Sequence, residues 1–129
     1  FRSMKLNKIH HIAIIVSDYE KSKAFYTKQL GFDIIRENYR KDRGDYKLDL
    51  KLGDCELEIF SGKGHPARPS YPEACGLRHL AFHVEDIEET IRELNEAGIE
   101  TEDIRRDTFT GKKMTFFHDP DGLPLELHE

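Results

Sequence analysis

The sequence predicts an α+β fold made of two βαβββ modules in tandem, with curved mixed sheets. Three observations lead to this prediction: an eight-residue phrase that occurs twice, a capped helix after each copy, and three strand-like segments after each helix. The phrase reads HIAIIVSD at residues 11–18 and HLAFHVED at residues 79–86. A duplication of this kind accounts for nearly the whole chain.

Each copy of the phrase alternates as a β-strand does. Ile12, Ile14 and Val16 would share an apolar face, as would Leu80, Phe82 and Val84. The opposite face carries imidazoles: His11, Ala13 and Ile15 in the first copy, and His79, Ala81 and His83 in the second. A sheet with one face packed on a helix and the other lining a cavity gives this pattern.

Each phrase ends in an aspartate that can accept hydrogen bonds from the free N–H groups of a first helical turn. Residues 18–31 and 86–98 are therefore expected to be helices, each stopped by a glycine, Gly31 or Gly98. Glu89 stands at the capping-box position of the second helix. The buried stripe of the first helix is predicted at Tyr19, Ser22, Tyr26 and Leu30.

Three strand-like segments follow each helix, at 32–38, 46–53 and 54–60, and at 99–106, 112–119 and 123–129. Turns are expected at Gly53-Asp54 and at residues 119–122. These elements give one domain over residues 4–129, with modules 4–62 and 76–129 joined by a Gly- and Pro-rich linker at 63–75. Phe1, Arg2 and Ser3, which precede Met4, are interpreted as a cloning remnant.

Composition excludes several classes of protein. The chain has 129 residues with 20 Lys and Arg against 25 Asp and Glu, so the net charge is −5. The two signs are interspersed, which argues against a nucleic-acid partner. No apolar run approaches a membrane span or a secretory signal, so we expect a cytoplasmic protein. Two reduced thiols, Cys55 and Cys75, are then expected, although a single disulfide stays open.

One histidine and one glutamate recur at the same interval in both modules. Glu58 follows His11 by 47 positions, and Glu126 follows His79 by 47 positions. By strand alternation, all four side chains lie on the face away from the helix. If two such modules pack about a pseudo-twofold axis, His11, Glu58, His79 and Glu126 converge.

Two converging buried carboxylates would repel each other, and a divalent cation removes that repulsion. Two nitrogen and two oxygen ligands suit Zn, Ni, Co, Mn or Fe(II), and four ligands on an open sheet leave a position for water or substrate. Taken singly, a strand histidine or glutamate is more often structural, and only the repeated pattern favours a metal.

The other histidines are interpreted separately. His10 shares the face of Ile12 and is interpreted as structural, and His65 in the linker has no role. Three further histidines fall, by strand alternation, on the face that would line the cavity: His83, His118 and His128. For each of them, a supporting role beside the metal ligands stays open.

The two modules, GLRHLAFHVED and FFHDPDGLPLELHE resemble the vicinal-oxygen-chelate superfamily of glyoxalases, bleomycin-resistance proteins and dioxygenases over residues 6–128. The resemblance implies sheets that cup a metal, which chelates adjacent substrate oxygens. The order His11, Glu58, His79, Glu126 matches the metal ligands of bacterial glyoxalase I. It implies a lactoylglutathione lyase-like metalloenzyme that holds Ni, Co or Zn, or else Mn or Fe. Glu58 or Glu126 would act as the catalytic base, and the reaction would pass through an enediolate.

The resemblance also implies limits on the substrate. The positions that bind glutathione in glyoxalase I here hold Ile15, Gly62 and Cys75. We therefore expect a small α-oxo or α-hydroxycarbonyl substrate and transfer the metal chemistry, but not the glutathione specificity. Cationic side chains in loops could substitute, although solvated surface charge is the commoner role for each: Arg40, Arg43, Lys47, Arg68 and Arg78.

Alternative functions remain open at this point. One is a non-catalytic module that binds or sequesters a small molecule, as resistance proteins do. Another is an epimerase or a dioxygenase of the same superfamily, although epimerases usually have glutamine at the place of Glu58, and dioxygenases use two histidines and one glutamate. Relatives commonly form homodimers, so a homodimer is expected.

Overall fold

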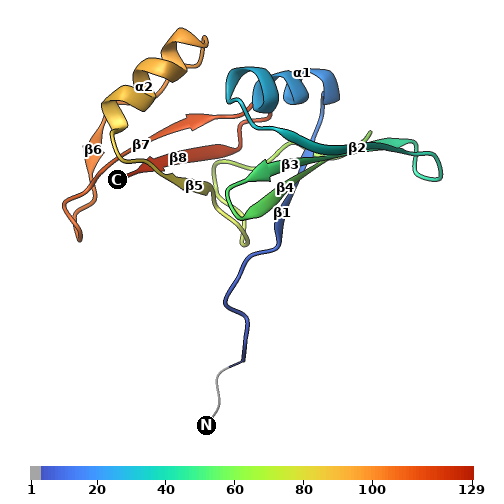
Figure 1. The fold of residues 1–129 in the computed structure, drawn as a ribbon, viewed down its shortest axis with the longest axis horizontal. Helices are drawn as coiled ribbons and strands as arrows, with labels where there is room; N and C mark the ends of the chain where they lie inside the picture. The colour runs from blue at the N-terminus through green and yellow to red at the C-terminus, as the bar shows by residue number, and fades with distance from the viewer. Residues whose placement is uncertain (1–3) are drawn as a thin grey trace. The chain divides into compact units, whose positions relative to one another are not determined.

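The computed structural model describes residues 4–129 and confirms the α+β class. The chain forms two compact units, unit 1 ending at His65 and unit 2 beginning at Pro66. Each unit holds one open, four-stranded mixed sheet (Figure 1). The interpretation of Phe1, Arg2 and Ser3 as a cloning remnant concerns residues outside those described.

Unit 1 has the strand order β1-β4-β3-β2, with β1 parallel to β4 and the other pairs antiparallel. Its helix lies across one face of the sheet (Figure 1). The fully buried side chains on that face include Leu48, Leu50, Leu57 and Ile59. The strands are β1 (His11–Val16), β2 (Ile34–Arg40), β3 (Asp45–Leu52) and β4 (Cys55–Ser61).

The helix of unit 1 is shorter than the predicted 18–31. It consists of α1 (Tyr19–Ala24) followed by a π-helical turn, η1 (Phe25–Gln29). The hydroxyl of Thr27 donates to the carbonyl of Lys23 at 2.6 Å, and the N–H of Leu30 donates to the carbonyl of Phe25 at 2.9 Å. The Thr27 hydroxyl therefore donates to the helix carbonyl of Lys23. The following turn is closed by a bond between residues five apart, which makes it wider than an α-helical turn. The predicted stripe is confirmed at Tyr19, Ser22 and Tyr26, whereas Leu30 is half-buried.

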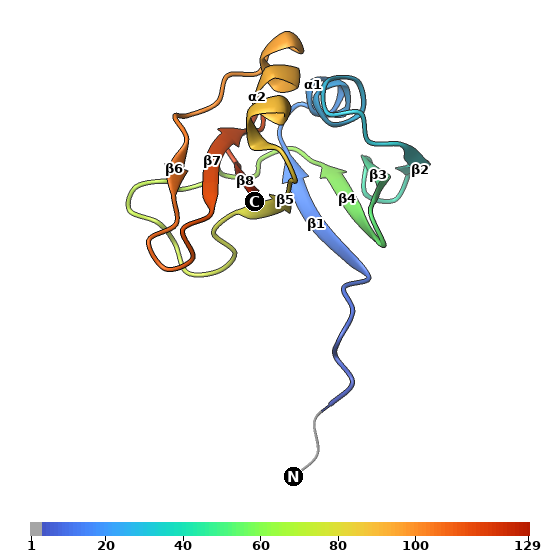
Figure 2. The same cartoon turned by 60° about the vertical axis from the view of Figure 1, so that its left-hand side comes forward.

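Unit 2 repeats this plan with the strand order β5-β8-β7-β6, where β5 is parallel to β8 (Figure 2). The helix α2 (Ile87–Glu96) buries Ile87 and Leu94. The strands are β5 (Leu80–His83), β6 (Arg105–Arg106), β7 (Lys113–His118) and β8 (Pro124–His128). His79 directly precedes β5 and does not begin it.

The strand predicted at 99–106 is wrong for most of its length, since only Arg105–Arg106 pairs as β6. Ile99 instead closes the end of α2: it is 7% exposed, and its N–H donates to the carbonyl of Leu94. The next residues are tied to β7 by single contacts, including a bond from the Thr115 hydroxyl to the carbonyl of Glu102 at 2.7 Å. Over most of residues 99–106, the contact of Ile99 with the end of α2 and the hydrogen bond of the Thr115 side chain therefore take the place of regular strand pairing with β7.

Both predicted caps and both glycine stops are confirmed. The carboxylate of Asp18 accepts from the N–H of Lys21, and that of Asp86 accepts from the N–H of Glu89. The side chain of Glu89 binds Arg92 instead of completing a capping box. Gly31 and Gly98 have φ of +81° and +84°, the left-handed conformation that suits glycine after a helix.

Both predicted turns are present as well. Gly53-Asp54 joins β3 to β4, and Gly53 has a φ of +56°. In the turn at 119–122, the carboxylate of Asp119 accepts from the N–H groups of Asp121 and Leu123. Between residues 4 and 129, no helix is both long and apolar enough to cross a membrane.

Candidate metal centre

The same strand register positions one histidine–glutamate pair in each unit. In unit 1, the parallel pairing of β1 and β4 places Ala13 opposite Glu58, so His11 is the diagonal neighbour of Glu58 on that face. In unit 2, the parallel pairing of β5 and β8 places Ala81 opposite Glu126, with His79 on the same diagonal. Alternation along each strand turns all four side chains away from the helix.

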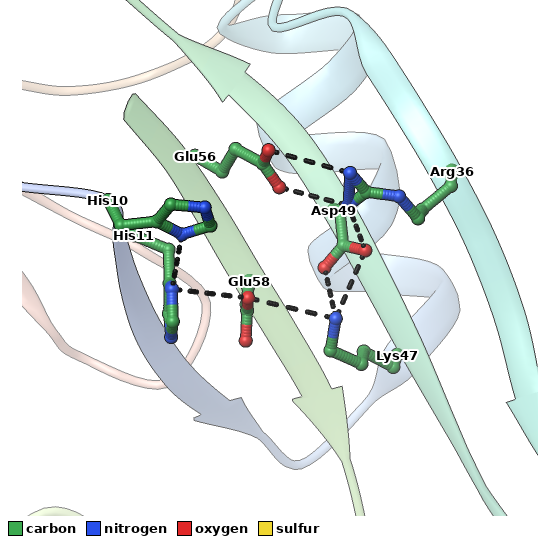
Figure 3. Close-up of polar contacts among 7 residues, drawn as sticks. All are labelled: His10, His11, Arg36, Lys47, Asp49, Glu56 and Glu58. Carbon is green, nitrogen blue, oxygen red and sulfur yellow. Dashed lines mark hydrogen bonds and ion pairs between the residues drawn. The ribbon is translucent and has the colours of Figure 1, made fainter. Parts of the chain in front are cut away.

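In unit 1 the imidazole of His11 approaches the carboxylate of Glu58. His11 Nδ1 lies 3.6 Å from Glu58 Oε2 (Figure 3). The His11 side chain is 43% exposed and that of Glu58 only 11% exposed. The carboxylate is thus largely removed from water, while the ring remains accessible to a ligand.

In unit 2 the corresponding contact is closer. His79 Nε2 lies 3.0 Å from Glu126 Oε1, and the Glu126 side chain is 8% exposed. The ring of Phe116 packs edge-on against His79, with the ring centroids 5.2 Å apart. Over residues 4–129, His79 is the only basic side chain that contacts this carboxylate as an ion pair.

A charged network surrounds Glu58 in unit 1 (Figure 3). Arg36 Nη1 donates to Asp49 Oδ2 at 2.7 Å and to Glu56 Oε1 at 2.9 Å. Lys47 Nζ donates to Asp49 Oδ1 at 2.9 Å and lies 3.7 Å from Glu58 Oε2. Arg36 therefore bridges the carboxylates of Asp49 and Glu56, and Lys47 lies between those of Asp49 and Glu58.

Asp49, Glu56 and Glu58 form an acidic cluster that could hold a metal ion, since one oxygen of each lies within 4.8 Å of the others. Arg36 and Lys47 already bind both oxygens of the fully buried Asp49. Glu58, in contrast, lies 3.7 Å from Lys47 Nζ and 3.6 Å from His11 Nδ1. Sequence reasoning did not select Asp49, although its alternation with Lys47 in β3 places it on the face of Glu58.

The remaining histidines have different surroundings. His10 is exposed, and its Nδ1 lies 2.9 Å from His11 Nδ1, a contact that the strand pattern did not predict. His118 lines a pocket beside His79, and His83 is exposed.

His128 contacts neither metal-pair residue of unit 2 by a hydrogen bond; its ring binds the carbonyl of Glu129 and, at 3.5 Å, the carboxylate of Asp107. These acceptors raise the pKa of His128, the carbonyl contributing most. The N–H of Phe109, followed by His128, lowers the pKa of Asp107.

The structure thus brings His11 together with Glu58, and His79 together with Glu126, as the repeated interval predicts. The convergence of both pairs on one ion stays a prediction. Of the cationic side chains that could substitute for the missing glutathione contacts, Lys47 lies in the network of unit 1, and Arg68 and Arg78 line the pocket of unit 2.

Comparison with known proteins gives close matches over almost the whole chain. The Bacillus subtilis protein YwkD is 61% identical over 127 residues, covering 98% of this chain and 99% of that protein. The Escherichia coli protein YaeR is 54% identical over 125 residues, covering 96% and 97%. The crystal structure of a glyoxalase family protein from Enterococcus faecalis has 66% identity and a TM-score of 0.93, covering 98% of this chain and all of that one.

More distant matches carry activities in their names. Human mitochondrial methylmalonyl-CoA epimerase is 26% identical and covers 96% of this chain and 74% of the epimerase. A mutant of the Listeria monocytogenes fosfomycin resistance protein FosX, complexed with Mn(II), has 21% identity and a TM-score of 0.72, covering 95% of this chain and 92% of that one, so it shows a shared fold. A family model matches residues 8–127. The chain therefore belongs to the glyoxalase/bleomycin resistance protein/dioxygenase superfamily.

Proposed function

We propose that the protein is a metal-dependent lyase or isomerase of the glyoxalase type. Its substrate would be a small α-oxo or α-hydroxycarbonyl compound, such as the adduct of a thiol. His11 and Glu58 of one unit, with His79 and Glu126 of another, would bind one divalent cation. Ni, Co or Zn suits this set of ligands best, and Mn or Fe(II) would also fit.

The observation that carries the proposal is the occurrence of the same buried carboxylate beside an imidazole in both units. Glu126 is 8% exposed, and its only ion-pair partner in the described chain is His79. Burying a carboxylate so far from water is costly without a compensating positive charge, and a divalent cation would supply one. Two pairs provide two nitrogen and two oxygen donors, and their two negative charges balance M²⁺. The residues therefore fit a divalent metal.

Proton transfer would be the task of the chain's own carboxylates. A bound divalent cation would acidify a carbon-bound proton by polarising the neighbouring oxygens of the substrate. Glu58 or Glu126 would then accept that proton and return it to the adjacent carbon. The low exposure of both glutamates excludes water that could otherwise take the proton.

An epimerase is the second candidate, because methylmalonyl-CoA epimerase matches almost the whole chain. Epimerisation needs the same removal of a carbon-bound proton but returns it to the opposite face of the same carbon, so the two candidates would share their metal ligands and differ in the substrate and in where the proton returns. A panel of hemithioacetals and of 2-substituted acyl thioesters separates them.

The decisive experiment is metal analysis of the purified protein and of four variants. We expect one divalent ion per set of four ligands, and we expect Glu126→Gln and His79→Ala to bind it at least about tenfold more weakly, because each loses a ligand. The controls are Glu85→Gln, an exposed carboxylate after β5, and His83→Ala, on the same face of β5 as Ala81.

Turnover should fall by about 10² or more in Glu126→Gln and in Glu58→Gln, the contribution typical of a general base. Both controls should keep metal content and activity. If Glu126→Gln and His79→Ala bound the metal as well as the unchanged protein does, the proposed site would be wrong.

A further inference from the structure

Unit 2 contains a pocket of about 200 Å³ directly beside His79. Three arginines line it, each from a different segment: Arg68 from the residues after His65, Arg78 before β5, and Arg105 in β6. We propose that this pocket binds an oxyanion, a carboxylate or a phosphate, at one end of the substrate. The inference rests on the proposed function only in assigning that oxyanion to the substrate.

The charge of the pocket differs from that of the whole protein, which carries −5. Arg78 Nε pairs with Glu73 Oε2 at 2.9 Å, and Arg105 Nη2 pairs with Glu102 Oε1 at 3.0 Å, so these two cations are partly neutralised. Arg68 has no carboxylate within 4.0 Å among residues 4–129. The lining therefore keeps a positive charge, which sits on Arg68.

Two backbone carbonyls hold Arg68 in position. Its Nη2 donates to the carbonyl of Leu77 at 3.1 Å and to that of Arg78 at 2.6 Å. The guanidinium thereby joins the two ends of the loop that precedes His79. Because only one of its nitrogens is used in these bonds, the planar fork keeps donors for a carboxylate or phosphate.

The walls of the pocket limit what can accompany the oxyanion. Phe116 and Pro124 form part of the sheet side, and the guanidinium of Arg105 lies over the ring of Phe116 at 5.3 Å from its centroid. A volume of about 200 Å³ is below the roughly 300–1,000 Å³ usual for sites that enclose a whole drug-sized ligand. The pocket therefore suits a compact charged end of a molecule, with the remainder outside.

The position of the pocket links it to the candidate metal centre. His79 lines the pocket and also contacts Glu126 at 3.0 Å, and the ring of Phe116 packs against His79. A substrate with its oxyanion at Arg68 would have its next few carbons beside the histidine–glutamate pair.

The test is anion binding to the metal-free protein, followed by NMR of backbone and arginine side-chain N–H groups. Inorganic phosphate and acetate are the two probes, which separate a phosphate site from a carboxylate site. Acetamide, which has the shape of acetate without its charge, is the neutral control. We expect saturable shifts at Arg68, Arg105 and His79 with at least one anion and none with acetamide.

Two variants should weaken anion binding about tenfold, the loss expected from one charged hydrogen bond: Arg68→Gln and Arg105→Gln. Arg92→Gln, an equal charge change on the exposed side of α2, should have no effect. Because Arg68 also fastens a loop, Arg68→Lys is the second variant, expected to keep the charge and part of the binding. Thermal unfolding of each variant checks that it is folded.

The inference is overturned if Arg92→Gln weakens binding as much as Arg68→Gln, or if the shifts lie outside the pocket. The metal affinity of the same variants is a separate measurement, which tests the proposed function independently of the oxyanion site. Arg68→Gln and Arg105→Gln should bind metal as the unchanged protein does, whereas Glu126→Gln should not. Pocket shifts in a protein that never binds metal would support the oxyanion site and refute the proposed metalloenzyme.

Discussion

Unit 1 and unit 2 carry the same histidine–glutamate pair on equivalent strands, but the third strand surrounds the pair differently. In unit 1, β3 places Asp49 opposite Glu58, and Arg36 and Lys47 complete an ionic network. In unit 2, β7 places Phe116 opposite Glu126, and no such network is present in the described residues of that sheet. The duplicated scaffold therefore preserves the histidine–glutamate pair and varies its neighbours.

This difference bears on the roles that the proposed function gives to the two units. The carboxylate of Glu58 lies near Lys47 and beside two further carboxylates, whose negative charge disfavours another anion on this face of unit 1. The carboxylate of Glu126 lies against an aromatic ring, and an arginine-lined pocket opens beside its histidine. Under the proposed function, unit 1 would supply an anchored pair of metal ligands, whereas unit 2 would receive the substrate.

The largest expected effect tests whether the two sheets are equally well supported. Leu57 and Leu125 each precede the ligand glutamate and are fully buried against the helix side. Leu57→Ala and Leu125→Ala should each lower the free energy of unfolding by about 2–5 kcal/mol, because each leaves a cavity. Denaturant unfolding measures the loss, and amide hydrogen exchange shows in which unit it falls. A loss below about 1 kcal/mol in one variant alone would show that the two cores are not equivalent.

The next effect concerns the network that distinguishes unit 1. Asp49→Asn should destabilise the protein by about 1–3 kcal/mol, because Arg36 and Lys47 would lose the charge of a fully buried partner. Asp45→Asn is the matched control on the same strand, paired with Arg40 and less buried than Asp49, and should cost less than Asp49→Asn. Equal losses in both variants would mean that the burial of Asp49 adds nothing.

The smallest effect concerns the ion pair that ties the helix to the sheet in each unit. Lys23 on α1 binds Glu37 on β2, and Lys113 on β7 binds Glu88 on α2. Lys23, followed by Tyr19, lowers the pKa of Glu37 below its ordinary value of 4.5. Glu37→Gln should cost about 0.5 kcal/mol at neutral pH, since the pair is partly exposed, and Glu88→Gln less, since Glu88 is more exposed.

The loss of stability in Glu37→Gln should depend on pH in a definite direction. Because the folded pKa of Glu37 is lowered, its contribution is present above the unfolded pKa and is lost as pH falls through the folded pKa. The difference from the unchanged protein should therefore vanish in acid, as measured by denaturant unfolding between neutral pH and about pH 3. A difference that grew in acid would contradict the assigned ion pair.

Much of the fold followed from local patterns, because those patterns act over a few residues. Asp18 and Asp86 cap helices, and the alternation of HIAIIVSD and HLAFHVED places His11 and His79 on the polar face. The prediction of a strand at 99–106 was wrong for most of its length, because Ile99 and Thr115 make contacts that an alternating sequence pattern does not indicate. The π-helical turn at Phe25–Gln29 was likewise not indicated by the helical pattern of the sequence.

The sequence by itself determined which residues repeat and which face of a strand each occupies, since a period of two and an equal interval in both modules are local facts. Only the tertiary structure decided what lies beside them. Asp49 meets Glu58, and Phe116 meets Glu126, through the register of strands distant in the sequence. Arg68 and Arg105 line the same pocket, where Arg68 donates to the carbonyls of Leu77 and Arg78, and these contacts do not follow from any pattern along the chain.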